Sequence, residues 1–205
     1  MKRLSMAQAA VAIILVGGFG CGAVGGGAPE MGTPLPVRDG TYLRYVDEAR
    51  VSSKFPRSTT IRFEDAGEDT FRYIETFRIE SRDRPDYSEE NTSPITIVRR
   101  DGIVLRFADE DLKPNALGKE QVMNRRVKAW LAEEDRVPGA EVRLEGFPGN
   151  NPVTERRSWK RWKVAVVAMH GYEYYFDEGT GFLVGWRNEG GDTWTLERTN
   201  ASGLR

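Results

Sequence analysis

This 205-residue chain has little of the side chains that carry most catalytic and metal chemistry, since it contains one cysteine and one histidine. With Cys21 alone, no disulfide can form within the chain. His170 has no second histidine or cysteine in the same domain to complete a usual zinc site, and its place before Gly171 predicts a solvated turn. A Gly-x-Ser-x-Gly elbow, a P-loop and a dinucleotide fingerprint are also missing. We therefore expect no enzyme activity, no metal and no cofactor.

An excess of charge of one sign is missing too. The chain has 30 Lys and Arg against 31 Asp and Glu, a formal net charge of -1, and loss of Lys2 and Arg3 with a leader would make it about -3. Balanced charge gives no strong attraction to nucleic acid, so no nucleic-acid partner is expected. Hydrophobic residues make up 39% and aromatic residues 10%, which is typical of a folded domain.

Residues 1–20 contain the one long apolar run of the N-terminal region. Lys2 and Arg3 precede a hydrophobic stretch from Ala7 to Val16, which has the length of a signal-peptide core. This stretch is shorter than the roughly 20 apolar residues that span a bilayer. We therefore predict that residues 1–20 are a signal peptide for export.

The only cysteine follows directly, in Gly18-Phe19-Gly20-Cys21-Gly22. This arrangement resembles the lipobox of bacterial lipoproteins, in which a cysteine after a small residue receives a diacylglycerol group and becomes the new N-terminus. The resemblance implies lipidation of Cys21 and anchoring in the membrane of the cell envelope. In that family, an aspartate after the lipidated cysteine retains the protein in the inner membrane. Gly22 stands at this position, so the resemblance implies anchoring in the outer membrane, facing the periplasm. The alternative is an ordinary secretory signal, which leaves Cys21 removed or as a free thiol.

The remaining chain is interpreted as a tether, one domain and a tail. Residues 21–38 comprise the lipidated cysteine and a stretch rich in Gly and Pro, which is typical of a flexible tether. Residues 39–200 suit one domain in length and contain no further linker or repeat. We assign residues 201–205 to a disordered tail.

The domain reads mainly as β-structure. From residue 159 to 199, aromatic and aliphatic residues recur at every second position, for example Tyr172, Tyr174 and Phe176, and glycine-containing turns separate the runs. In the first half, Glu75 interrupts an otherwise apolar series, and we interpret Ile74 beside it as a bulge that switches the face. Further strands are expected at 41–46, 59–64, 70–80, 95–99, 103–107 and 140–145.

Between the two β regions, one helix is predicted from Lys119 to Glu134. Met123, Val127, Trp130 and Leu131 fall on one helical face at i, i+4, i+7 and i+8. The predicted fold is therefore mainly β (α+β): a single curved antiparallel sheet or half-barrel of about ten strands with one covering helix. We expect the polar stretch Ser81–Pro94 to be a loop and Asp109-Glu110-Asp111 to be a solvated turn, rather than a cation site.

The segment Tyr174-Tyr175-Phe176-Asp177-Glu178-Gly179-Thr180-Gly181-Phe182-Leu183-Val184 resembles a hairpin of LolA-like and related mycobacterial lipid-carrier lipoproteins. That family has curved antiparallel sheets around an apolar cavity that holds acyl chains. The resemblance, which covers about a dozen residues, implies a similar fold and a hydrophobic ligand, either a lipid or an acylated protein. The residues expected to line the ligand site are Trp130, Trp162, Tyr174, Phe176, Phe182 and Trp186.

Two other interpretations stay open. Residues 156–163 interleave cations with indoles, which suits anionic lipid headgroups or an acidic partner, but also suits a strand with one wet face. As an alternative to a carrier, the protein is an envelope interaction or structural lipoprotein with a filled core and protein-binding loops such as Ser81–Pro94. An unfilled apolar interior would favour the carrier, and a packed one would favour the interaction protein.

Overall fold

The computed structural model describes residues 33–107, 110–111, 125–145, 147 and 149–204, so the predicted signal peptide and Cys21 lie outside the described residues. The described part is mainly β, as predicted, and contains two short 3-10 helices but no α-helix. Its elements are β1 (Thr41–Asp47), β2 (Arg57–Gly67), β3 (Thr70–Ile79), η1 (Pro85–Tyr87), β4 (Glu89–Thr92), β5 (Thr96–Arg99), β6 (Val104–Phe107), β7 (Glu110–Asp111), η2 (Glu133–Asp135), β8 (Glu141–Val142), β9 (Asn151–Trp159), β10 (Trp162–Met169), β11 (Tyr172–Asp177), β12 (Leu183–Asn188) and β13 (Thr193–Thr199).

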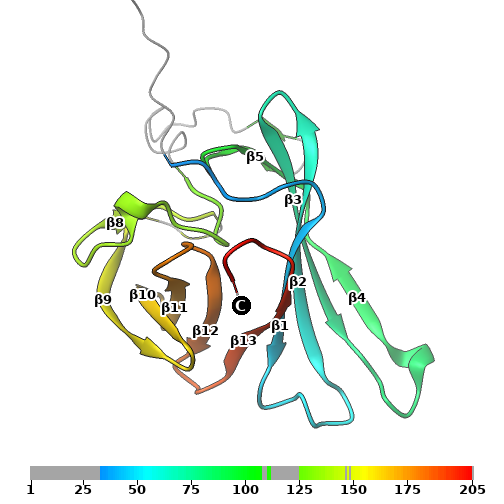
Figure 1. The fold of residues 1–205 in the computed structure, drawn as a ribbon. Coiled ribbons are helices and arrows are strands. Elements are labelled where there is room, and N and C mark those ends of the chain that lie inside the picture. Colours follow the sequence, from blue (N-terminus) through cyan, green and yellow to red (C-terminus); the bar gives the residue numbers. More distant parts are fainter. Residues whose placement is uncertain (1–32, 108–109, 112–124, 146, 148, 205) are drawn as a thin grey trace, which may run out of the picture. The chain divides into compact units, whose positions relative to one another are not determined.

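The thirteen strands form one open antiparallel sheet. Its order is β7-β6-β5-β3-β2-β1-β13-β12-β11-β10-β9-β8, and β4 pairs separately with the end of β3. The first and last strands of the described residues, β1 and β13, lie side by side in the middle of the sheet (Figure 1). The N-terminal and C-terminal halves of the sheet therefore meet at this single strand pair.

The strand pattern follows from the side chains. In β1, alternate residues are buried, as period 2 predicts for a sheet with one covered face. The centres of β10 and β11 differ, because Val164 to Val167 and Tyr174 to Phe176 are buried on both faces. Such continuous apolar runs indicate strands with cover on both sides.

The predicted helix is wrong for the residues that can be seen. Residues 125–132 form instead an irregular segment with a turn at Lys128 and Ala129, called the crossing segment below, and residues 119–124 lie outside the described residues. Its backbone pairs with two parts of the sheet: Val127 N donates to Gly102 O at 2.8 Å, and Leu131 N donates to Gly181 O at 2.9 Å. Ala129 to Ala132 are all buried, so the segment has apolar residues on every side. The same residues also happen to fit a helical spacing, which is why the sequence pattern predicted a helix.

Trp130 is the centre of this crossing segment. Its side chain is 1% exposed, and its Nε1 donates a hydrogen bond to the Thr180 carbonyl at 3.0 Å. Two glycines make room for the indole, since a Cβ at Gly102 would lie 2.9 Å from the ring and one at Gly181 would lie 2.9 Å from Nε1. The backbone of the crossing segment can thus lie close to the turns that it covers. A helix has a larger diameter and could not approach them as closely.

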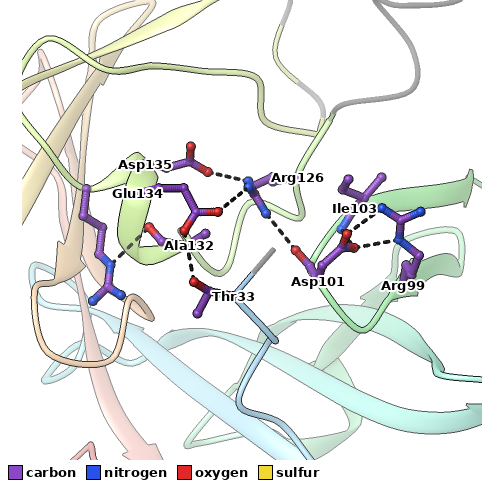
Figure 2. Close-up of polar contacts among 9 residues, drawn as sticks. Thr33, Arg99, Asp101, Ile103, Arg126, Ala132, Glu134 and Asp135 are labelled. Carbon is purple, nitrogen blue, oxygen red and sulfur yellow. Dashed lines mark hydrogen bonds and ion pairs between the residues drawn. The ribbon is translucent and has the colours of Figure 1, made fainter. Parts of the chain in front are cut away.

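An ion-pair network fixes the end of the crossing segment (Figure 2). Arg126 donates from Nη1 to the Asp101 carbonyl at 2.8 Å and from Nη2 to Glu134 Oε1 at 3.2 Å, and it forms a close ion pair with Asp135. Thr33 donates to the other oxygen of Glu134 at 3.0 Å. Charge-assisted bonds of this kind hold a segment that has few regular ladder bonds.

Asp101 also anchors the turn between β5 and β6. Its carboxylate accepts from Arg99 Nε at 2.9 Å and from the Ile103 amide at 3.2 Å. Burial opposes ionisation of this carboxyl, but the Arg99 and Ile103 hydrogen bonds outweigh it, so the pKa of Asp101 is lowered. The ionised form is the one that the turn uses.

Several local expectations differ from the structure. The expected loop Ser81–Pro94 contains η1 and β4, and Glu110 and Asp111 of the expected turn form strand β7. Leu35, in the predicted tether, and Ala201 and Leu204, in the predicted tail, are buried against the core. Among the described residues, no helix is long and apolar enough to cross a membrane.

Candidate functional site

A row of aromatic side chains crosses the core-facing side of the sheet. Consecutive ring centroids lie 6.0 Å apart for Tyr172 and Tyr174, 6.4 Å for Tyr174 and Trp186, 5.3 Å for Trp186 and Trp194, and 6.1 Å for Trp194 and Phe77. We call these five residues the aromatic ladder. Its rings come from β11, β12, β13 and β3, so it reaches from one half of the sheet to the other.

The ladder packs against the core and is only partly buried. Trp186 and Trp194 stack with an interplanar angle of 10°. The ring centroid of Trp186 also lies 5.1 Å from that of the buried Tyr45. Yet Phe77, Trp186 and Trp194 are only partly buried, and Tyr172 is 39% exposed. Large aromatic surfaces left in water are a recurring property of binding surfaces.

Glu75 lies on the same core-facing side, which is a correction to the predicted bulge. β2 and β3 pair without a register shift at this point, and Glu75 is opposite the buried Ile61. Cross-strand partners share a face, so the carboxylate points into the apolar side. It is held there by Lys128 of the crossing segment, whose Nζ lies 2.5 Å from Glu75 Oε2.

A second carboxylate, Glu145, lies near this ion pair. Its Oε1 accepts a hydrogen bond from Thr96 Oγ1 at 2.7 Å, and its Oε2 is buried with no hydrogen-bond partner. Tyr73, the cross-strand neighbour of Thr96, is 3% exposed, and its hydroxyl interacts with the carboxylate of Glu75 on the same strand. We call Tyr73, Glu75, Thr96, Lys128 and Glu145 the buried polar cluster.

Electrostatics connect the buried polar cluster to the aromatic ladder. Burial, and then the charge of Glu75, raise the pKa of the Tyr73 hydroxyl. The pKa of Tyr174 is raised by burial, by Tyr172 and by Glu75, which places the Glu75 charge near the ladder. Burial raises the pKa of Glu145, against the opposing hydrogen bond from Thr96 and the charge of Lys128.

The raised pKa of Glu145 predicts a pH dependence of stability. A carboxyl whose folded pKa lies above its unfolded value, about 4.3, contributes stability below that value and loses it as pH rises through the folded pKa. Glu145→Gln has no carboxyl to ionise, so it avoids this loss of stability, and its side-chain oxygen can still accept the hydrogen bond from Thr96. We expect the variant to be more stable than wild type at pH 7 to 8, with the difference shrinking toward pH 4. Urea unfolding followed by tryptophan fluorescence across this range measures it.

The matched control is Glu89→Gln, which changes an exposed carboxylate of β4. This variant should leave the stability within about 0.5 kcal/mol of wild type, because substitutions at exposed positions usually have small effects. A Glu145→Gln profile parallel to wild type from pH 4 to 8 would contradict the burial argument.

The structure separates the six residues expected to line the ligand site. Tyr174 and Trp186 belong to the aromatic ladder. Three others, Trp130, Phe176 and Phe182, are at most 1% exposed and pack in the core. Trp130 and Phe182 form an isolated antiparallel β-bridge there. Trp162 lies on the opposite face, stacked on Trp159 with ring centroids 5.7 Å apart.

The cation and indole run of residues 156–163 surrounds that stacked pair. Lys160 lies over the Trp159 ring at 5.2 Å, and Arg161 lies over Trp162 at 4.5 Å. Most of its positive charge is already neutralised, which favours the interpretation of a strand end with one wet face. The ion pairs are Arg156 with Glu178, Arg157 with Glu173 and Lys160 with Glu48.

Three surface cavities have polar linings. One of about 280 Å³ lies among arginines and glutamates of β1 to β4, including Arg44, Arg62 and Arg78. One of about 430 Å³ surrounds His170 at the β10–β11 turn, and another of about 280 Å³ borders Arg125. Within the described ranges, no group of three or more His, Cys, Asp or Glu side chains is arranged to hold a metal ion.

Sequence reasoning missed most of the buried polar cluster. Lys128 and Glu145 are ordinary charged residues in sequence, and their contacts exist only after the crossing segment is placed. Glu75 did carry a signal, because a lone carboxylate in a period-2 apolar series is costly to bury and so marks a position with a partner. Trp194 and Phe77 lie in regions that the sequence predicts as strands, but nothing in the sequence marks them as part of a site.

Comparison of the chain with protein-family models, with curated proteins and with solved structures gave no match. The likeness to LolA-like carriers and to the lipobox therefore stays a prediction based on the residues quoted for each.

Proposed function

We propose that this chain is an exported, lipid-anchored binding protein of the cell envelope that holds a hydrophobic ligand, a lipid or an acylated protein, on its aromatic ladder. In this proposal the sheet is curved like a half-barrel, and the ladder lies on its concave side. The chain has no enzymatic activity, and its ligand is bound without a cofactor.

One observation carries the proposal: five aromatic rings are in consecutive contact across β11, β12, β13 and β3, and four of them, all but Tyr174, are incompletely buried. Covering such rings with an acyl chain removes apolar surface from water at about 25 cal/mol per Å². The ladder also differs from the core around Trp130, where no surface is left to cover.

The location in the envelope is supported by the sequence. Lys2, Arg3 and the apolar run after them favour export, and Cys21 favours a lipid anchor. A single acyl anchor binds membranes weakly, whereas two or more chains hold a protein there stably. We propose the outer membrane, facing the periplasm, as the location.

A second candidate function is favoured by the packed core. Trp130, Phe176 and Phe182 fill the interior where the predicted cavity was expected, as in an envelope protein that acts through its loops. The segment Ser81–Pro94 presents Tyr87, which is 57% exposed and lies under Arg84 at 3.8 Å. Aromatic and arginine pairs of this type are common in protein-protein contacts.

The test is ligand analysis of the full chain purified from its own host. Native mass spectrometry followed by lipid extraction should give a bound acyl-containing molecule. Titration with 1-N-phenylnaphthylamine, an uncharged apolar fluorophore, should then give saturable binding that Trp186→Ala weakens roughly tenfold, since a large aromatic contact is lost.

The control is Phe55→Ala, which shortens a 51% exposed ring outside the ladder and should bind the fluorophore as wild type does. A clean protein mass together with no saturable fluorophore binding would remove the carrier proposal and favour the interaction protein. Crosslinking in the envelope would then identify the partner.

A further inference from the structure

Two neighbouring loops carry the most exposed apolar side chains of the described residues. Residues 48–56 connect β1 to β2, and residues 80–88 connect β3 to β4. Tyr87 is 57% exposed, Phe55 is 51% exposed and Val51 is 42% exposed, and the first two have the largest exposed fractions among the large apolar side chains described. We call the two loops together the loop tip. Single exposed apolar residues are common on protein surfaces, whereas several in one place indicate an interaction site.

Hydrogen bonds hold the two loops of the tip side by side. Arg82 N donates to Lys54 O at 3.1 Å, and Glu80 N donates to Pro56 O at 3.0 Å. The Arg82 guanidinium also donates, from Nη2, to Val51 O at 2.6 Å. Figure 1 shows both loops at the lower end of the sheet. The three apolar side chains therefore belong to one part of the surface.

The loop tip has a local excess of positive charge. Arg50 and Arg82 form no ion pair with a carboxylate among the described residues. Each carboxylate of the loop tip, in contrast, already has a cation: Glu48 pairs with Lys160, Glu80 with Arg78, Asp83 with Lys54 and Asp86 with Arg84. Aromatic rings beside Arg and Lys are typical of the interface of a bilayer, where the rings lie at headgroup level and the long cationic side chains reach the phosphates.

The loop tip adjoins one end of the aromatic ladder. Phe77, the last ring of the ladder, lies two residues before Ile79, which is opposite Arg57, the first residue after the loop 48–56. Trp194, the ring before it, is opposite Asp47, the last residue before the same loop. At about 3.3 Å per residue, Phe77 is roughly 7 Å along β3 from the end of the strand. A bilayer in contact with the loop tip would thus lie close to the ladder.

We propose that the loop tip docks the folded domain on a lipid bilayer with anionic headgroups, with Val51, Phe55 and Tyr87 inserted at headgroup level. Arg50 and Arg82 interact there with the lipid phosphates. This docking goes beyond the proposed function, because it requires neither a ligand on the aromatic ladder nor a lipid on Cys21. Where the ladder does hold a ligand, the ligand passes to and from the bilayer at Phe77.

The test uses the full chain with Cys21→Ser, which removes the only native thiol and the proposed lipid anchor. Val51→Cys in this background is labelled with nitrobenzoxadiazole and mixed with vesicles of phosphatidylcholine and phosphatidylglycerol in equal parts. We expect a blue shift and a rise of the emission, because the label leaves water. Binding should be weaker by about fivefold or more on phosphatidylcholine alone, since each Arg near an anionic surface contributes roughly that factor.

The matched control is Val137→Cys in the same background, because Val137 is 45% exposed and lies outside the loop tip. Its label should keep the spectrum that it has in water. Both labelled chains have the same N-terminal residues, so a difference between them reports the loop tip. Labels that respond alike, labels that do not respond, or equal binding to both kinds of vesicle would overturn the inference. Crosslinks from Val51→Cys to an envelope protein, without a response to vesicles, would make the loop tip a protein contact instead.

Two further variants separate docking from ligand binding. Phe55→Ala, added to the labelled Val51→Cys chain, should weaken vesicle binding roughly three- to tenfold, because less apolar surface is inserted. Trp186→Ala should leave vesicle binding unchanged, although it weakens the fluorophore. The titration with 1-N-phenylnaphthylamine contains no vesicles, so a failure of the proposed function and a failure of the docking are seen in different measurements.

Discussion

Trp130→Ala is expected to lower the free energy of unfolding by about 3–5 kcal/mol, the usual loss for removing a fully buried large aromatic side chain. The indole is 1% exposed and donates a hydrogen bond to the Thr180 carbonyl, which the variant leaves without its donor. Because small domains are stable by only about 5–15 kcal/mol, this loss is a large part of the total. Urea unfolding followed by far-UV circular dichroism measures it.

Trp194→Ala is the matched comparison for Trp130→Ala. Trp194 is partly buried in the aromatic ladder, so its removal should cost less stability and should instead weaken fluorophore binding. Trp130→Ala should leave the affinity of the molecules that remain folded close to wild type. A Trp130→Ala variant that keeps wild-type stability and loses binding would restore Trp130 to the ligand site.

Gly181→Ala is expected to destabilise the protein by about 3–5 kcal/mol. Gly181 has φ of +79°, a conformation that costs other residues about 1–2 kcal/mol. A Cβ there would lie 2.1 Å from the Leu131 carbonyl oxygen, a backbone atom of the crossing segment that cannot move alone. The segment would have to detach from β12, which breaks the hydrogen bond from Leu131 N to Gly181 O.

Gly191→Ala separates the clash from the backbone strain. Gly191 has φ of +89° in the turn before β13, and a Cβ there meets nothing within 4 Å. Gly191→Ala should therefore lower the free energy of unfolding only by the backbone strain, about 1–2 kcal/mol. Thermal unfolding of the two variants side by side tests the argument, and equal losses would mean that the crossing segment is not held closely at Gly181.

The strands were predictable where local pattern and burial coincide. The sequence places a strand at 70–80, and β3 spans Thr70–Ile79, because alternate apolar residues meet a covered face. β4 was not predictable in this way, since Glu89 to Thr92 are exposed and owe their strand conformation to pairing with β3. Edge strands with polar sequences carry no hydrophobic pattern.

The candidate site was predictable only in part, for a related reason. Tyr174 and Trp186 alternate within regular strands, so their common face follows from period 2. Trp130 was predicted to lie on a covering helix because its apolar neighbours fit a helical spacing, whereas burial on all sides explains them equally well. The buried polar cluster joins residues 73 and 75 with residues 96, 128 and 145, and no short-range signal relates positions so far apart in the chain.

The pairing of β1 with β13 also determines the order in which the protein can fold. A chain delivered from its N-terminus, during synthesis or during passage through a membrane, presents β1 about 150 residues before its partner arrives. Until then one edge of the N-terminal half has unpaired amide and carbonyl groups, and such edges readily join strands of other molecules. Contacts of this sequence separation form slowly. The incomplete chain is thus the state in which this protein is most exposed to aggregation and most in need of a chaperone.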